Sequence, residues 1–116
     1  MPDPIARAGE PQTQTPSQEE RLMGEILAEL RRARTKFPGD NVTTLALVEE
    51  VGELAKATFE ESRARVREEA VQVAVMAMRV ILDGDQTLDT WRAGKGLDEL
   101  APSHLRHHFR SHHADR

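Results

Sequence analysis

The stretch LALVEEVGELAKATF, residues 45–59, decides the fold and carries the most informative side chains. Read as a helix, it places Glu49 and Glu53 four residues apart and Glu50 and Glu53 three apart, so all three carboxylates fall on one face. Like charges at these spacings repel each other. The acidic face of such a helix is either exposed to solvent or binds a cation, and the spacing alone is compatible with both interpretations.

A second helix is predicted downstream, from about residue 63 to Leu82, with Gly84 as its stop. Between residues 70 and 82 only Gln72 and Arg79 are not apolar, so we expect this helix to be buried on nearly all sides and to form the centre of the core. These two polar residues lie two helical turns apart and share a face. Each needs a partner there, because an unpaired buried polar group costs about 1–3 kcal/mol.

One further helix is predicted before the acidic stretch. Ser17 and Glu20 form a capping-box pattern, and apolar residues then recur at helical spacing as far as Phe37. Pro38 and Gly39 should end this helix. The next helix start is less sharply defined, and its candidate N-caps are Asp40, Asn41, Thr43 and Thr44, while Thr87 could cap a short helix after Gly84.

The domain organisation follows from these elements. Residues 1–16 hold four of the six prolines, and we expect them to form a disordered tail. Residues 17–101 form one all-α domain, and residues 102–116 form a polar, His-rich tail.

Composition supports packed helices and excludes several classes of function. With only Trp91 and three phenylalanines as aromatic residues, the core must be built from aliphatic side chains, as in all-α proteins. A formal net charge of −4 argues against binding to a nucleic-acid polymer or to an anionic membrane. The chain has no cysteine, no membrane-spanning run and no signal-peptide pattern, so we expect a cytoplasmic protein.

Antiparallel packing of the two inner helices would bring the acidic face of the first opposite the polar face of the second. Their oxygen donors would come from Glu49, Glu50, Glu53, Glu69 and Gln72. Hard oxygen donors suit Mg²⁺ or Mn²⁺, and a magnesium site is commonly completed by substrate phosphates. The pattern therefore predicts a divalent-cation site between two helices.

At these residues the sequence resembles the MazG-like nucleotide pyrophosphohydrolases, the all-α NTP pyrophosphatase superfamily. Their motif is Glu-Glu-x-x-Glu followed, after a variable gap, by Glu-x-x-Asp. Here residues 49–53, EEVGE, match the first half, and residues 69–72, EAVQ, match the second half except at the last position. The resemblance covers roughly residues 20–83.

The resemblance implies Mg²⁺-dependent hydrolysis of a nucleoside triphosphate, or a close analogue, to the monophosphate and pyrophosphate. Carried over by position, Glu50, Glu53 and Glu69 would be metal ligands and Gln72 would stand where the family has an aspartate. Glu49 would lie beside the metals as the candidate general base. It further implies an assembly of helical subunits, which we expect to be a homodimer or homotetramer.

Gln72 is the departure from the family pattern, because an amide oxygen coordinates without contributing negative charge. Three interpretations follow: an active enzyme with altered metal stoichiometry, replacement of the carboxylate by Asp83 or Asp85, or an inactive relative that only binds. For Asp83 to replace the carboxylate missing at position 72, its side chain would have to act from about 16 Å further along the helix.

Three basic residues each have two possible roles. Lys36, Lys56 and Arg79 are candidate contacts for substrate phosphates, although ordinary surface charge, or an interhelical ion pair for Arg79, would also explain them. The competing class of function for the whole chain is a non-catalytic helical module that binds nucleotide or metal or mediates assembly.

Overall fold

The computed structural model describes residues 14–100 of the chain, and every regular element in that range is helical. The helices follow one another as α2 (Gln18–Lys36), α3 (Thr43–Glu60), α4 (Arg63–Asp83) and α5 (Gln86–Ala93). This confirms the predicted all-α class. The tail predicted at residues 102–116 and most of that at residues 1–16 lie outside the described residues.

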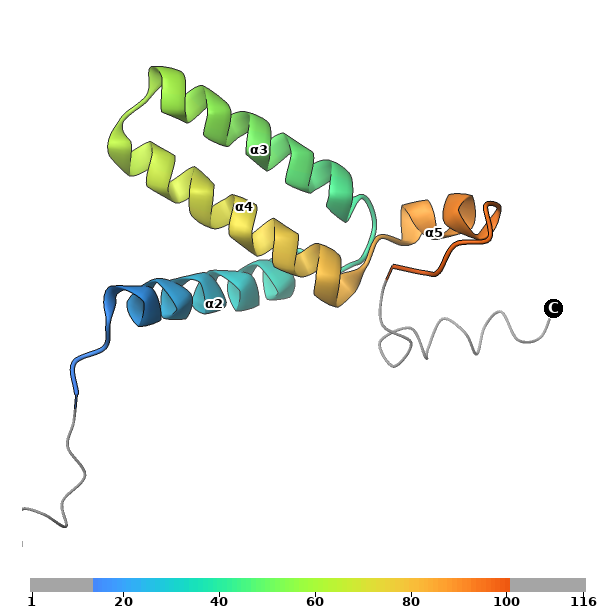
Figure 1. Cartoon of the computed structure of the whole chain (residues 1–116), viewed down its shortest axis with the longest axis horizontal. Helices are drawn as coiled ribbons and strands as arrows, with labels where there is room; N and C mark the ends of the chain where they lie inside the picture. Colours follow the sequence, from blue (N-terminus) through green and yellow to red (C-terminus); the bar gives the residue numbers. More distant parts are fainter. Residues whose placement is uncertain (1–13, 101–116) are drawn as a thin grey trace, which may run out of the picture.

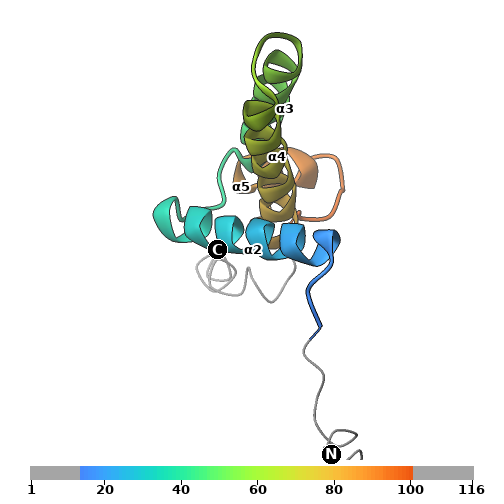
Figure 2. The same cartoon turned by 90° about the vertical axis from the view of Figure 1, so that its left-hand side faces the viewer.

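Helices α3 and α4 form an antiparallel hairpin, as predicted, and α2 crosses α4 steeply (Figures 1 and 2). Within the described range, α2 packs against α4 but not against α3, so α4 is the middle layer. Helix α5 lies beyond the C-terminal end of α4 (Figure 1). No helix between residues 14 and 100 has both the length and the apolar content needed to cross a membrane.

The predicted helix boundaries agree closely with those observed. The Ser17 hydroxyl accepts from the Glu20 amide at 3.1 Å and the Glu20 carboxylate accepts from the Ser17 amide at 3.2 Å, so the capping box starts α2. Helix α2 ends just before Phe37 and Pro38. Helix α4 ends at Gly84, whose φ of 70° is readily adopted by glycine.

The hydrophobic core is small and lies mainly between α2 and α4. Leu30 and Ala33 of α2 pack with Val71 and Val75 of α4. Ala57 of α3 is fully buried, on the face of this helix that packs against α4. A core of this size stabilises a single chain only modestly.

Helix α4 is less buried than the sequence predicted. Met78 is 38% exposed and Ile81 is 67% exposed, so the expectation of burial on nearly all sides was wrong. The reason is geometric, because α2 and α3 cover two faces of α4 and leave a third without a neighbouring helix among residues 14–100.

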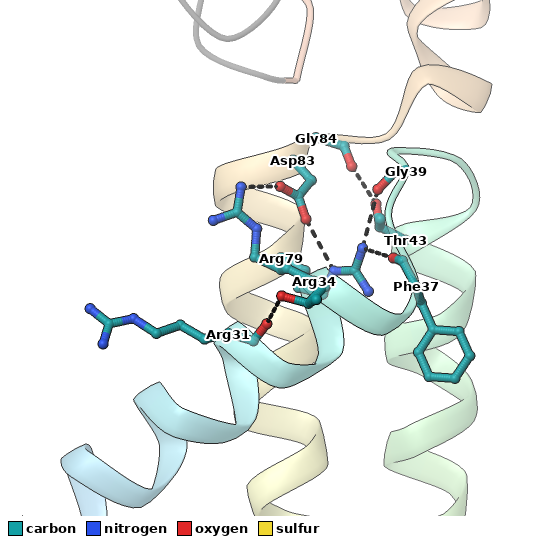
Figure 3. Close-up of polar contacts among 9 residues, drawn as sticks. Arg31, Arg34, Phe37, Gly39, Thr43, Arg79, Asp83 and Gly84 are labelled. Carbon is teal, nitrogen blue, oxygen red and sulfur yellow. Dashed lines mark hydrogen bonds and ion pairs between the residues drawn. The ribbon is translucent and has the colours of Figure 1, made fainter.

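A buried arginine joins the end of α2 to the end of α4 (Figure 3). The Arg79 guanidinium donates to the carbonyls of Phe37 at 2.7 Å and Gly39 at 3.2 Å, and to the Asp83 carboxylate at 3.0 Å. Arg34 donates to the other oxygen of Asp83 at 2.7 Å. Arg79 therefore closes the α2–α3 connection over the C-terminal turns of α4.

Asp85 begins α5 and also holds the start of α3. Its carboxylate accepts from the amides of Val42 at 3.1 Å, Thr44 at 3.0 Å and Thr87 at 3.2 Å. Val42, the N-cap position of α3, has a φ of 52°, a left-handed conformation that is costly for a β-branched residue. The two bonds to Asp85 stabilise this start.

The N-caps proposed from the sequence for these two helices were therefore wrong. Neither Asp40, Asn41, Thr43 nor Thr44 caps α3 with its side chain, and Asp85 rather than Thr87 is the N-cap of α5. The cause is tertiary, because the carboxylate that caps α3 lies some forty residues downstream of it in the chain.

Asp85→Ala is expected to lower the free energy of unfolding by about 2–4 kcal/mol, because it removes an acceptor that serves three amides in a site where Asp85 is only 2% exposed. The Val42 amide alone of the three keeps a second acceptor, the Thr87 hydroxyl at 3.2 Å. Urea denaturation followed by circular dichroism measures the change. Asp98→Ala, at an exposed position, is the control and should change stability by less than about 0.5 kcal/mol. Equal stability of the two variants would contradict this role for Asp85.

Candidate functional site

Glu50 lies on the face of α3 that packs against α4. The residues of this face are buried or half-buried and recur at helical spacing: Thr43, Leu47, Glu50, Leu54 and Ala57. Glu49 and Glu53 are exposed beside it. Of the three motif glutamates in α3, Glu50 is thus the one directed at the neighbouring helix.

The carboxylate that meets Glu50 is Glu69 of α4, which is only 8% exposed. Burial raises the pKa of Glu50, and a hydrogen bond with Glu69 and repulsion from the Glu69, Glu49 and Glu53 carboxylates raise it further. Of the five oxygen donors predicted to converge, Glu50 and Glu69 therefore meet across the hairpin.

Arg65 supplies positive charge to the same point. Its guanidinium donates to Glu69 Oε1 and to Glu68 Oε2, each at 2.6 Å, and lies 3.5 Å from Glu61 Oε2. Arg65 is half-exposed, whereas Glu69 is buried. The negative charge at Glu69 is thus partly neutralised by a side chain that can move into solvent.

Gln72 turns away from α3 and toward α2. Its amide Nε2 donates to Glu29 Oε1 at 2.9 Å. Hydrogen bonds from Arg32 and then from Gln72 lower the pKa of Glu29 to about 2, so this carboxylate stays ionised. The structure therefore brings Glu69 to Glu50 but places Gln72 against a different carboxylate.

Glu29 was missed by the sequence analysis. It precedes the core residue Leu30, at the edge of the buried stripe of α2, and nothing in the sequence distinguishes it from the other charges of that helix. Only the crossing of α2 over α4 shows that it faces the position where the family motif has an aspartate.

A groove of about 550 Å³ runs between α2 and α4 beside Glu69. Its charged lining consists of Glu25, Glu29, Arg32, Arg65, Glu68 and Glu69. This volume lies in the range of small-molecule sites. The groove combines carboxylates with two guanidinium groups, the side chains that bind divalent cations and phosphates respectively.

The other residues predicted to contact substrate are dispersed. The Lys36 ammonium lies 5.3 Å from the centre of the Phe37 ring, and Lys56 is exposed on α3. Arg79 is 6% exposed and bonded to Asp83 and two carbonyls, which gives it a structural role. Its role in substrate binding stays a prediction that this geometry does not favour.

The carboxylates considered as replacements for the missing aspartate are also occupied elsewhere. Asp83 is bonded to Arg34 and Arg79, and Asp85 caps two helices. None of these hydrogen bonds involves Glu69.

Glu50 and Glu69 provide part of the ligand set that a divalent cation needs. Among residues 14–100, no three acidic or histidine side chains are grouped so as to hold a metal ion as they stand. The Glu50 and Glu69 pair does fit Mg²⁺, which is commonly held by one or two carboxylates, waters and substrate phosphates. The raised pKa of Glu50 also reflects a repulsion that a bound cation would relieve.

Comparison of the chain with protein-family models, with curated proteins and with solved structures finds no match. The MazG-like resemblance accordingly rests on residues 49–53 and 69–72 and on the helical hairpin that carries them.

Proposed function

We propose that this protein is a metal-dependent nucleotide pyrophosphohydrolase, which cleaves a nucleoside triphosphate or analogue to the monophosphate and pyrophosphate in the cytoplasm. The observation that supports this most is the convergence of Glu50 and Glu69 across the α3–α4 hairpin. Two carboxylates brought together between helices, with one arginine, Arg65, paired to Glu69, are suited to binding a divalent cation.

The proposed roles follow from position. Glu50 and Glu69 bind Mg²⁺, or Mn²⁺ in its place, and Glu53 at the exposed edge completes the acidic set. Bound Mg²⁺ would offset the charge that develops on the phosphate oxygens. Glu49, exposed beside Glu50, accepts the proton of the attacking water.

Gln72 has a supporting role in this proposal. By donating to Glu29 at 2.9 Å it fixes that carboxylate in the wall of the groove between α2 and α4. Arg32 and Arg65 in the same groove are the side chains we propose for contact with the substrate phosphates. Both are presently paired with glutamates, and substrate would compete for them.

The function is tested by isothermal titration with Mn²⁺, followed by an assay of pyrophosphate release over a panel of nucleotides. We expect binding and turnover on at least one nucleotide. Glu53→Gln should abolish turnover with little loss of folding, and Glu19→Gln, exposed at the start of α2, is the matched control. Unchanged turnover in Glu53→Gln would remove Glu53 from the mechanism.

The second candidate is a non-catalytic helical module that keeps the fold. It is favoured by the amide at position 72 and by the lack of a ready three-ligand metal group within residues 14–100. Metal binding without turnover on any nucleotide would support this candidate over the enzyme.

Arg65→Gln is expected to tighten Mn²⁺ binding by about 3–10-fold, because the Arg65 guanidinium now occupies Glu69 and must leave before that carboxylate can coordinate. Isothermal titration of the variant and the unmodified chain measures this. Arg67→Gln is the control, since Arg67 pairs with Glu25 of α2 instead. Weaker binding in Arg65→Gln would show that Arg65 supports the site rather than competes with the metal.

We also propose that the working form is a homo-oligomer, a dimer or a tetramer. The support is the set of large apolar side chains that stay exposed on each of the three long helices, including Leu27, Leu45 and Ile81. On α3 these side chains, Leu45, Val48 and Phe59, gather on one helix face, and an apolar face of this kind marks an interaction surface.

A further inference from the structure

The outer face of α3 is apolar along its whole length. Helix α3 packs on α4 with one face, lies on the far side of α4 from α2 (Figure 1), and makes no packing contact with another helix in the described part of the chain. Its opposite face carries an outer stripe of five residues: Leu45, Val48, Gly52, Ala55 and Phe59. Leu45 is 66% exposed, Val48 61% and Phe59 86%.

The spacing of the outer stripe is that of a helix–helix interface. The five residues are separated by 3, 4, 3 and 4 positions, the heptad spacing that keeps one line of side chains facing a partner helix. The stripe extends for about 21 Å along the helix. Val51, 47% exposed, widens it on one side.

We propose that the outer stripe binds the outer stripe of a second copy of this chain, with the two α3 helices antiparallel about Gly52. Leu45 lies seven residues before Gly52 and Phe59 seven residues after it, so an antiparallel pair places Leu45 of each copy against Phe59 of the other. Val48 similarly meets Ala55. The stripe is thus complementary to itself, as a two-fold interface requires.

The charges beside the stripe select the antiparallel arrangement. Glu49 and Lys56 border it on the same edge, on opposite sides of Gly52. An antiparallel pair brings Glu49 of one copy near Lys56 of the other, twice. In a parallel pair the two copies of this edge would lie on opposite sides of the interface, so Glu49 and Lys56 of the two copies would not meet.

Gly52 gives an independent reason for a partner at this position. A glycine inside a helix lowers helix stability relative to alanine, so its presence needs a compensating contact. Among residues 14–100 there is none, because a Cβ placed on Gly52 would meet no heavy atom of this range within 4 Å. At the crossing point of two helices, however, the missing side chain allows the backbones to approach closely.

This inference specifies the interface of the proposed homo-oligomer and does not depend on the proposed chemistry. Sedimentation equilibrium of the full chain should give at least twice the mass of one chain. Val48→Glu should weaken association at least about tenfold, because it buries a charge in the stripe. Met23→Glu, at a 68% exposed apolar residue of α2, is the matched control and should associate as the unmodified chain does.

The orientation is tested by exchange of charges. Glu49→Lys and Lys56→Glu should each weaken association, and the double variant should restore it. Circular dichroism verifies that the variants fold. A monomeric unmodified chain would overturn both the oligomer and the interface. An oligomer that Val48→Glu leaves intact, or that the double charge exchange fails to restore, would overturn the interface alone.

Discussion

Glu50→Gln is expected to stabilise the fold while it removes divalent-metal binding. The substitution keeps the shape of the side chain but ends its repulsion with Glu69, Glu49 and Glu53, which should add about 0.5–1 kcal/mol to the free energy of unfolding. For a domain of this size the melting temperature would rise by about 2–8 °C. Loss of one of the two carboxylates proposed as ligands should weaken Mn²⁺ binding by more than about tenfold.

The gain in stability should depend on pH in a defined direction. Because the pKa of Glu50 is raised above its ordinary value of 4.5, the folded state binds this proton more tightly than the unfolded state. The penalty from the charged carboxylate is therefore absent below pH 4.5 and complete once the pH exceeds the raised pKa. Thermal unfolding at neutral pH should show the gain, and unfolding below pH 4.5 should not.

Glu53→Gln is the control for this comparison, because Glu53 is exposed and should gain less stability than Glu50. A Glu50→Gln variant that is less stable than the unmodified chain at neutral pH would show that Glu50 is held by favourable contacts. The meeting of Glu50 with Glu69 would then stabilise the fold, and charge repulsion between them would not lower its stability.

Arg79→Met is expected to lower the free energy of unfolding by about 2–4 kcal/mol. The guanidinium is 6% exposed and serves two carbonyls of the α2–α3 connection together with Asp83. Methionine fills much of the same volume but removes the donor to both carbonyls and leaves Asp83 with Arg34 as its partner. Urea denaturation followed by circular dichroism measures the loss.

Arg34→Met is the matched control, since Arg34 bonds to the same Asp83 carboxylate but its side chain is 42% exposed. We expect it to cost less than about 1 kcal/mol. Equal losses for the two variants would mean that the ion pair to Asp83, and not the burial and carbonyl bonds of Arg79, carries the stability.

Helix content and order were predictable because they depend on local signals. The capping box at Ser17 and Glu20, the stop at Pro38 and the glycine at position 84 each act within a few residues. The start of α3 was not predictable, since its cap is Asp85, which reaches it only after the chain has folded back. The exposure of Ile81 was likewise hidden, because periodicity shows which residues are apolar but not how many neighbours cover them.

The candidate site was also predictable only in part, because some of its contacts depend on how the helices cross. The spacing on two antiparallel helices predicts that Glu49, Glu50 and Glu53 oppose Glu69 and Gln72, and of this set the structure brings Glu50 and Glu69 together. Gln72 was expected at the same point but lies against Glu29, because α2 crosses α4 on the side that the Gln72 position faces. No sequence pattern gives the crossing direction of α2, so Glu29 and the groove beside it could not have been found in advance.

The most direct test of the account is anomalous scattering from manganese in a crystal of the unmodified chain soaked with Mn²⁺. The account predicts a peak between the carboxylates of Glu50 and Glu69, with Arg65 displaced from Glu69. A fully soaked crystal with no peak at these carboxylates, or with manganese only at unrelated surface residues, would contradict it.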